Sequence, residues 1–138
     1  MTRGVLVDAG PLIAIVNRDD QDHGRCVAAL KRLRGPMMTT WMPVTEAMHL
    51  LSFSREGQEA LLEMIDRRAV HIVPIGEDDL RGVRALMRKY ADLPMDFADA
   101  TLVHVAIRDR LRDVFTLDLR DFGVYRIGPR RGFNIVSM

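Results

Sequence analysis

Residues 94–103 read Pro-Met-Asp-Phe-Ala-Asp-Ala-Thr-Leu-Val, and the fold of the chain is organised around this stretch. The spacing predicts a helix over 96–110, with Asp96 as its N-cap and Asp99 in its third position. Residues 102–107 are mostly apolar, so this helix is expected to be buried, with two carboxylates at its N-terminus. An acidic first turn alone indicates no function, because it also complements the helix dipole.

Short apolar runs alternate with the helical segments. The run Val5–Val7 lacks polar alternation, which is typical of a parallel strand covered on both faces. Other strands are expected at 37–40, 70–75, 114–117 and, as a fifth, 133–136. Helices are expected from Pro11 to 16, at 23–33, from Pro43, from an N-cap at Ser54 to 67, and at 77–91. This alternation predicts an α/β fold, a three-layer α/β/α sandwich around a mostly parallel sheet of four to five strands. We expect one domain over residues 1–138.

Carboxylates occupy equivalent places in four separate segments. Asp8 and Asp118 follow apolar strands, and Glu46 is expected in the first turn of the helix after the second strand. Asp96 and Asp99 begin the helix that precedes the fourth strand. Ligands of open parallel sheets bind outside the carboxyl ends of the strands, so these five acids are expected to converge there.

Carboxylates packed together repel one another unless a cation lies between them. A hard divalent cation, Mg²⁺ or Mn²⁺, is the natural partner for such oxygen ligands. A cation of this kind polarises a phosphate and lowers the pKa of a bound water. The pattern therefore favours metal-assisted hydrolysis of phosphodiester bonds.

Composition narrows the class of protein without naming an activity. The 138 residues are 48% apolar and 28% charged with a net charge of +1, which is typical of a globular protein and neither requires nor excludes nucleic acid. The single cysteine, Cys26, excludes an internal disulfide and favours a reducing cytoplasm. No run is long enough to span a membrane, and Asp8 interrupts the first apolar run, so no signal peptide is expected.

Other chemistries have weaker support in the sequence. The four histidines show no paired zinc spacing, and Glu46-x-x-His49 is half of a di-iron motif without a second copy. We interpret His49 as a helix-face residue. No phosphate-binding P-loop, dinucleotide fingerprint or nucleophile elbow is present.

The acidic segments resemble, in order, the motifs of PIN domains, and specifically the VapC-type ribonuclease toxins of toxin–antitoxin pairs. Residues 5–14 resemble the opening strand–Asp–helix motif, Thr45-Glu46-Ala47 the second motif, and Met95-Asp96-Phe97-Ala98-Asp99-Ala100 the third. Phe115-Thr116-Leu117-Asp118, followed by Asp121-Phe122, resembles the closing segment. Ala9 departs from the family, which often has Ser or Thr there, and this removes a hydroxyl beside Asp8.

The resemblance implies a PIN-like sandwich, Mg²⁺-dependent endoribonuclease activity, a homodimer and inhibition by a cognate antitoxin. We expect Asp8 and Asp99 to be the principal metal ligands, Asp118 and Glu46 to complete the site and Asp96 to assist. Thr116 is a candidate for orienting Asp118 or a water. Candidate contacts to RNA phosphates are Arg126, Arg130 and Arg131.

Two alternatives remain open at this stage. One is a receiver-like signalling module with an acidic Mg²⁺ pocket, although receivers carry adjacent acids after the first strand and a late Lys. Here Asp8 stands alone, and Lys31 and Lys89 both come early. The other is a catalytically silent binding module, which the intact acids disfavour.

Overall fold

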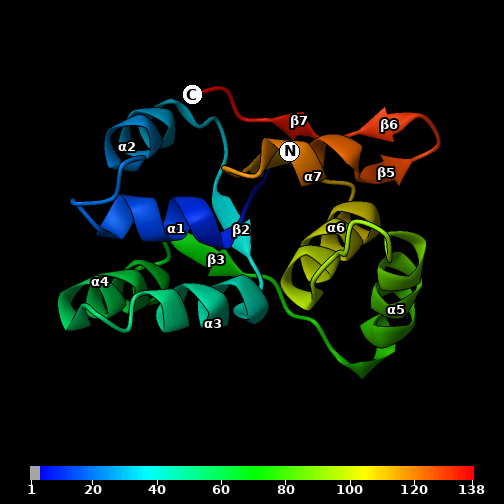
Figure 1. Cartoon of the computed structure of the whole chain (residues 1–138), viewed down its shortest axis with the longest axis horizontal. Coiled ribbons are helices and arrows are strands. Elements are labelled where there is room, and N and C mark those ends of the chain that lie inside the picture. The colour runs from blue at the N-terminus through cyan, green and yellow to red at the C-terminus, as the bar shows by residue number, and fades with distance from the viewer. Residues whose placement is uncertain (1–3) are drawn as a thin grey trace.

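The computed structural model describes residues 4–138, and its centre is a parallel sheet (Figure 1). The strand order across the sheet is β3-β2-β1-β4-β7, and every neighbouring pair is parallel. The sheet therefore confirms the predicted mostly parallel architecture and the fifth strand expected at 133–136. Its strands are β1 (Val5–Val7), β2 (Met37–Thr39), β3 (Val70–Ile72), β4 (Asp113–Phe115) and β7 (Asn134–Ile135).

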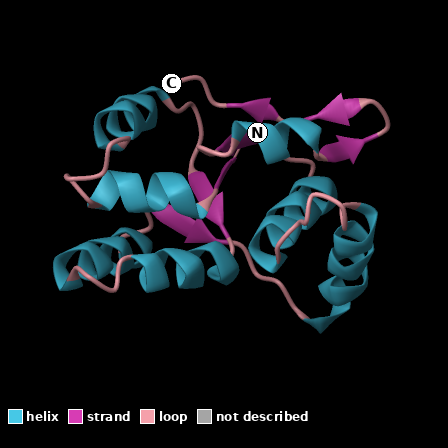
Figure 2. Cartoon of the chain, viewed as in Figure 1, coloured by secondary structure: helices cyan, strands magenta, loops and turns pink. Residues whose placement is uncertain are grey.

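Helices cover the sheet on both faces and make the predicted three layers (Figure 2). One layer holds α1 (Ala9–Val16), α2 (His23–Arg32), α3 (Trp41–Leu50) and α4 (Arg55–Asp66). The other holds α5 (Leu80–Lys89), preceded by the 3-10 turn η1 (Glu77–Asp79), and α6 (Phe97–Asp109). The C-terminal segment adds α7 (Leu119–Val124) and an antiparallel pair, β5 (Arg126–Gly128) and β6 (Arg131–Gly132).

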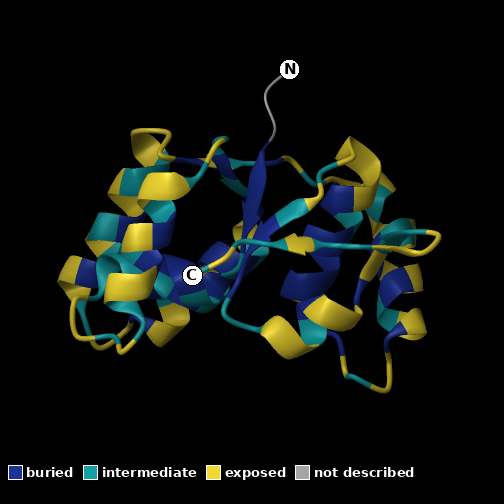
Figure 3. Ribbon diagram, turned by 90° about the horizontal axis from the view of Figure 1, so that it is seen from above, coloured by how far each residue is buried: buried dark blue, intermediate teal, exposed yellow. Residues whose placement is uncertain are grey.

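The sheet separates two hydrophobic cores because successive strand residues point to opposite faces. In β1, Val5 and Val7 pack with the α1–α4 layer, whereas Leu6 packs with the α5–α6 layer. In β4, Phe115 likewise packs with the α1–α4 layer and Val114 with the α5–α6 layer. Figure 3 shows the buried central strand between helices whose outer surfaces are exposed. The unalternating apolar sequence of β1 follows from this burial on both faces.

Two predicted helix starts are wrong, and both differences affect the site. Helix α1 begins at Ala9, because Asp8 itself serves as the N-cap and accepts a hydrogen bond from the Ala9 N–H, so Pro11 is not the first helical residue. Helix α3 begins at Trp41, and Glu46 therefore lies in its second turn and not in its first. Pro43 is compatible with this earlier start because the first turn of a helix leaves its N–H groups unpaired.

Neither α7 nor the β5–β6 hairpin was predicted. The hairpin turn contains Arg130, whose φ of 58° lies in the left-handed region that glycine usually occupies. The sequence there carries neither a helical nor an alternating apolar pattern, so propensity alone does not reveal these elements. Within residues 4–138, no helix has the length and apolar character needed to cross a membrane.

A polar contact fastens η1 and α5 to α6. The His104 ring Nε2 lies 2.8 Å from Asp79 Oδ1, and Arg108 donates to the same oxygen at 3.1 Å. The Gly76 N–H, His104 and Arg108 together lower the pKa of Asp79 to about 2. Gly82 lies directly against the His104 ring, where an added Cβ would be 2.5 Å from its Cε1 and Nδ1. The small residue in α5 is thus required by the ring in α6.

We therefore expect Gly82→Ala to destabilise the protein by about 1–2 kcal/mol, because the His104 ring must move and release Asp79. Gly24→Ala in α2 is the matched control, since nothing lies within 4 Å of its added Cβ. The control should be neutral or stabilise by about 0.5 kcal/mol through helix propensity. Urea unfolding of both variants measures the difference. A Gly82→Ala protein as stable as the control would contradict the packing argument.

Candidate metal centre

Acidic side chains from four segments line one open pocket at the carboxyl end of the sheet. We call it the acidic pocket; its volume is about 390 Å³. All five predicted acids lie on its wall, so the expected convergence is confirmed as geometry. Asp121, which was not assigned a role from the sequence, joins them. The lining residues are Asp8, Gly10, Glu46, Pro94, Asp96, Asp99, Leu117, Asp118 and Asp121.

Asp8 is held by two hydrogen bonds at the point where β1 ends. Its Oδ1 accepts from the Ala9 N–H at 2.8 Å, and its Oδ2 accepts from the Thr116 hydroxyl at 3.0 Å. The Thr116 oxygen in turn accepts from the Asp118 N–H at 2.9 Å. Thr116 therefore fixes the Asp8 carboxylate directly and the Asp118 backbone indirectly. It also supplies Asp8 with a hydroxyl, the group that Ala9 lacks.

The start of α6 matches the prediction from its sequence. Asp96 is the N-cap, and its Oδ1 accepts from the Asp99 N–H at 2.7 Å. Asp99 lies in the third helical position and is only 9% exposed. The hydroxyl of the fully buried Tyr125 donates to Asp99 Oδ2 at 2.9 Å. Tyr125 is a site residue that sequence reasoning missed, because only the fold brings it to α6.

The start of α7 repeats the arrangement of α6. Asp118 is the N-cap and its Oδ1 accepts from the Asp121 N–H at 3.0 Å, which again places an acid in the third helical position. One carboxylate oxygen from each of Asp99, Asp118 and Asp121 lies within 4.8 Å of the others. The repeated Asp-x-x-Asp spacing is the signal that would have identified Asp121 from the sequence.

Burial and like charge raise the pKa values of several of these groups. Burial is the main cause for Asp99, and the charges of Asp8 and Asp96 add to it, so the pKa of Asp99 rises to about 8 despite the hydrogen bond from Tyr125. Burial likewise raises the pKa values of Asp8, Glu46 and Asp121. A divalent cation relieves both effects, and a donor set of carboxylate oxygens fits Mg²⁺ or Mn²⁺.

The candidate phosphate-binding arginines differ in their surroundings. Arg126 Nη1 donates to the carbonyls of Gly123, Val124 and Tyr125, so its side chain stabilises the end of α7. Arg130 and Arg131 are exposed in the β5–β6 hairpin. The interpretation of His49 as a helix-face residue is confirmed, since His49 lies in α3 and is exposed.

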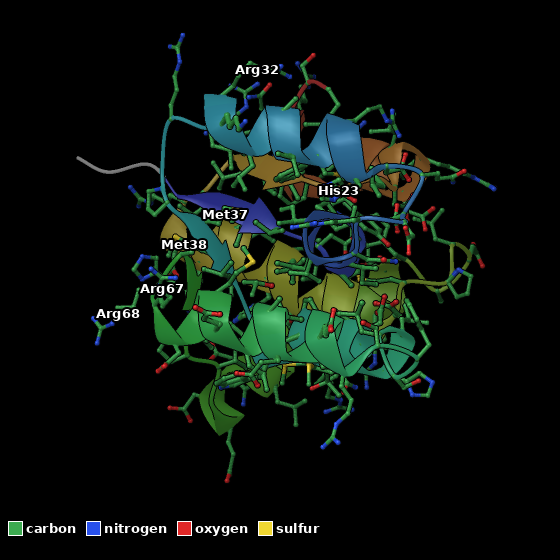
Figure 4. All side chains as sticks on the ribbon, turned by 90° about the vertical axis from the view of Figure 1, so that its left-hand side faces the viewer. His23, Arg32, Met37, Met38, Arg67 and Arg68 are labelled. Carbon is green, nitrogen blue, oxygen red and sulfur yellow. The ribbon has the colours of Figure 1, made fainter. Side chains whose placement is uncertain are left out.

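A more voluminous cavity than the acidic pocket lies elsewhere. It has a volume of about 580 Å³ and an apolar wall of Ile15, Val16 and Met64 from α1 and α4. His23 of α2 and Arg67 at the end of α4, both visible in Figure 4, also line it. We call it the α1–α4 cavity. It contains one acid, Glu63, and no cluster of metal-ligand type.

Comparison with known proteins connects the acidic pocket to a family. The PIN domain model matches residues 5–127. The chain is similar to Ribonuclease VapC26 of Mycobacterium tuberculosis, with 25% identity over 125 residues that cover 88% of this chain and 92% of the relative.

Three solved structures share the fold. The M. tuberculosis toxin VapC20, described as cleaving the sarcin–ricin loop, aligns with a TM-score of 0.72 and 18% identity over 84% of this chain and 91% of that one. A toxin–antitoxin complex from Klebsiella pneumoniae aligns with a TM-score of 0.66 and 18% identity over 96% of both chains. VapBC2 from Rickettsia felis, bound to promoter DNA, aligns with a TM-score of 0.66 and 12% identity over 97% of this chain and 99% of that one.

The raised pKa of Asp99 predicts how the metal-free protein responds to pH. Because the folded-state pKa, about 8, exceeds the usual 3.8, the contribution of Asp99 to stability is complete below pH 3.8 and is lost as pH rises toward 8. In EDTA at pH 8, Asp99→Asn should therefore melt on the order of 5 °C higher than the parent, and the gap should close toward pH 5.

Thermal melts by circular dichroism at pH 5, 6, 7 and 8 measure this gap. Asp19→Asn is the matched control, because Asp19 is an exposed carboxylate in the loop after α1. It should melt like the parent at every pH. If the difference in melting temperature between Asp99→Asn and the parent does not change with pH, the pKa of Asp99 is not raised in the folded protein.

Proposed function

Since the chain belongs to the PIN domain family, we propose that it is a metal-dependent endoribonuclease and the toxin of a toxin–antitoxin pair. The observation that carries the proposal is the acidic pocket, in which carboxylates from four segments converge on one small volume. Similarity to a curated ribonuclease supports RNA as the substrate. A receiver-like module is disfavoured because Asp8 is followed by Ala9 rather than by a second acid.

In this proposal Asp8, Asp99, Asp118 and Glu46 hold Mg²⁺, or Mn²⁺ in its place, and Asp96 assists. We add Asp121, whose oxygen lies in the same group as those of Asp99 and Asp118. When bound, the cation supplies Lewis-acid polarisation of the phosphate and a water of lowered pKa.

The protein's own contribution is to fix the carboxylates in advance. Thr116 orients Asp8, and Tyr125 orients Asp99 by donating to Oδ2. Asp99 must release its proton before it binds a cation, because its pKa lies near 8 in the metal-free pocket. Metal affinity should therefore rise with pH up to that value.

We further propose two protein partners. The α1–α4 cavity is a candidate docking place for a segment of the antitoxin, since it combines an apolar wall with charged rim residues such as Arg18 and Arg67. Leu50, Phe53 and Leu62 of the α3–α4 region are exposed and offer an apolar face for a homodimer. The cytoplasm, with its RNA and reduced thiols, is the compartment that this function requires.

The nuclease proposal predicts that the carboxylates act as one unit. Asp8→Asn and Asp99→Asn should each lower Mg²⁺-dependent cleavage of a labelled single-stranded RNA by on the order of 100-fold or more. The double variant should be little worse than either, because each change already disrupts the shared cation site. Glu46→Gln and Asp118→Asn should be impaired and partly rescued by high Mn²⁺.

Each variant is first checked for a cooperative melt in EDTA. Mn²⁺ at ten times its Kd should raise the melting temperature of the parent by about 3–6 °C and should do so far less in Asp8→Asn. Folded Asp8→Asn and Asp99→Asn proteins that cut RNA as fast as the parent would refute the proposed roles of these acids.

The homodimer is tested by light scattering on the purified chain. At micromolar concentration we expect about twice the monomer mass of 15.7 kDa. The pair of substitutions Leu50→Glu and Phe53→Glu should give a monomer, since charges on an apolar interface are costly to bury. A parent protein that is monomeric at tens of micromolar would refute the dimer and leave the nuclease proposal standing.

A further inference from the structure

An apolar recess adjoins the acidic pocket and shares part of its wall. It has a volume of about 390 Å³ and is lined by residues of α3 and of the start of α6. Glu46 and Asp96 line both hollows. We call it the recess; its lining residues are Met42, Thr45, Glu46, Asp96, Phe97 and Ala98.

Phe97 is the aromatic side chain of the recess. It is the first residue of α6, directly after the N-cap Asp96, and it is 46% exposed although it is large and apolar. The start of the helix does not need it, because the Asp96 carboxylate already satisfies the Asp99 N–H. Ala98, by contrast, is buried beside it. An aromatic face is thus presented to solvent beside the carboxylates.

Besides the carboxylates, the recess contains one polar side chain, that of Thr45, and its hydroxyl can only accept a further hydrogen bond. The Thr45 hydroxyl donates to the Trp41 carbonyl at 2.8 Å, so its proton is already used within α3. The lone pairs of the Thr45 oxygen remain available to accept a hydrogen bond. A ligand that suits the recess therefore offers a flat apolar surface with N–H groups on its edge.

We propose that the recess is the subsite for a nucleobase next to the phosphate that is cleaved, and that Phe97 stacks on that base. The inference rests on the nuclease function proposed above and names part of its substrate site. An RNA phosphate held at the acidic pocket places an adjacent base beside the shared wall of Glu46 and Asp96. Base–aromatic stacking is strong enough to matter, since it contributes about 5-fold to 150-fold in affinity per base.

The test combines changes in the protein with changes in the RNA. A labelled RNA with one known cleavage site is prepared as a series in which each nucleotide near that site is made abasic in turn. Phe97→Ala should raise KM for the intact RNA about 5-fold to 20-fold, with kcat changed less than 3-fold. On one of the abasic substrates the parent should show the same rise in KM. On that substrate Phe97→Ala should raise KM no further.

Other variants separate stacking from bulk. Phe97→Trp should retain the KM of the parent, whereas Phe97→Leu, which keeps apolar volume without a ring face, should resemble Phe97→Ala. Ile107→Ala is the matched control, because Ile107 lies at the far end of α6 and is 44% exposed. It should leave both kinetic constants unchanged.

Binding without cleavage gives an independent measurement. 2-Aminopurine replaces the nucleotide whose removal raises KM in the abasic series. This RNA is titrated with Asp8→Asn protein, and stacking should quench the fluorescence of the 2-aminopurine. Asp8→Asn combined with Phe97→Ala should lose the quenching. Quenching that persists in the combined variant would overturn the stacking role of Phe97.

Three further outcomes would overturn the inference. They are kinetics of Phe97→Ala equal to those of the parent, an equal loss on every abasic substrate, and a loss that coincides with dissociation of a dimer in light scattering. The last would assign the recess to contact between copies of the chain. A parent that cleaves no RNA would instead refute the nuclease function, and the base subsite with it.

Discussion

Repulsion among carboxylates at one edge of a parallel sheet is the constraint on which the rest of this structure depends. The energetic cost is concentrated on Asp99, because burial at the start of α6 raises its pKa most and the charges of Asp8 and Asp96 raise it further. The pocket withstands this cost because hydrogen bonds hold the carboxylates in place. Thr116 donates to Asp8, and Tyr125 donates to Asp99. The carboxylates that we propose as ligands of a divalent cation are thereby held in place in the folded chain.

The C-terminal segment completes the pocket. Tyr125 packs edge-to-face against Tyr90 and Phe122, with ring centroids 5.1 Å away in both cases. The hydroxyl of Tyr90 accepts from the Arg126 N–H at 2.8 Å, which fixes the chain immediately after Tyr125. The same short stretch supplies Asp118 and Asp121. Aromatic packing in the core beneath the α5–α6 layer therefore positions acidic groups at the surface, so the same residues contribute to stability and to the site.

Chemistry and specificity are proposed to meet on two helices that pack against each other. Helix α3 carries Glu46 together with Thr45, and the start of α6 carries Asp96 together with Phe97. Because the acidic pocket and the recess share a wall, a base in one and a phosphate in the other would be held in a fixed relation. Such positioning is the means by which binding energy from a non-reacting part of a substrate favours reaction.

Sequence by itself determined the parallel strands, the buried helix after Pro94 and the five acids that line the pocket. These features are local: apolar periodicity, the Asp96 cap and strand ends depend on neighbouring residues. Only the tertiary structure decided the rest. Asp121 and Tyr125 enter the site because α7 folds back on the sheet, and Glu46 reaches it from the second turn of α3. Contacts between residues distant in sequence arise from packing of whole elements, which no local pattern encodes.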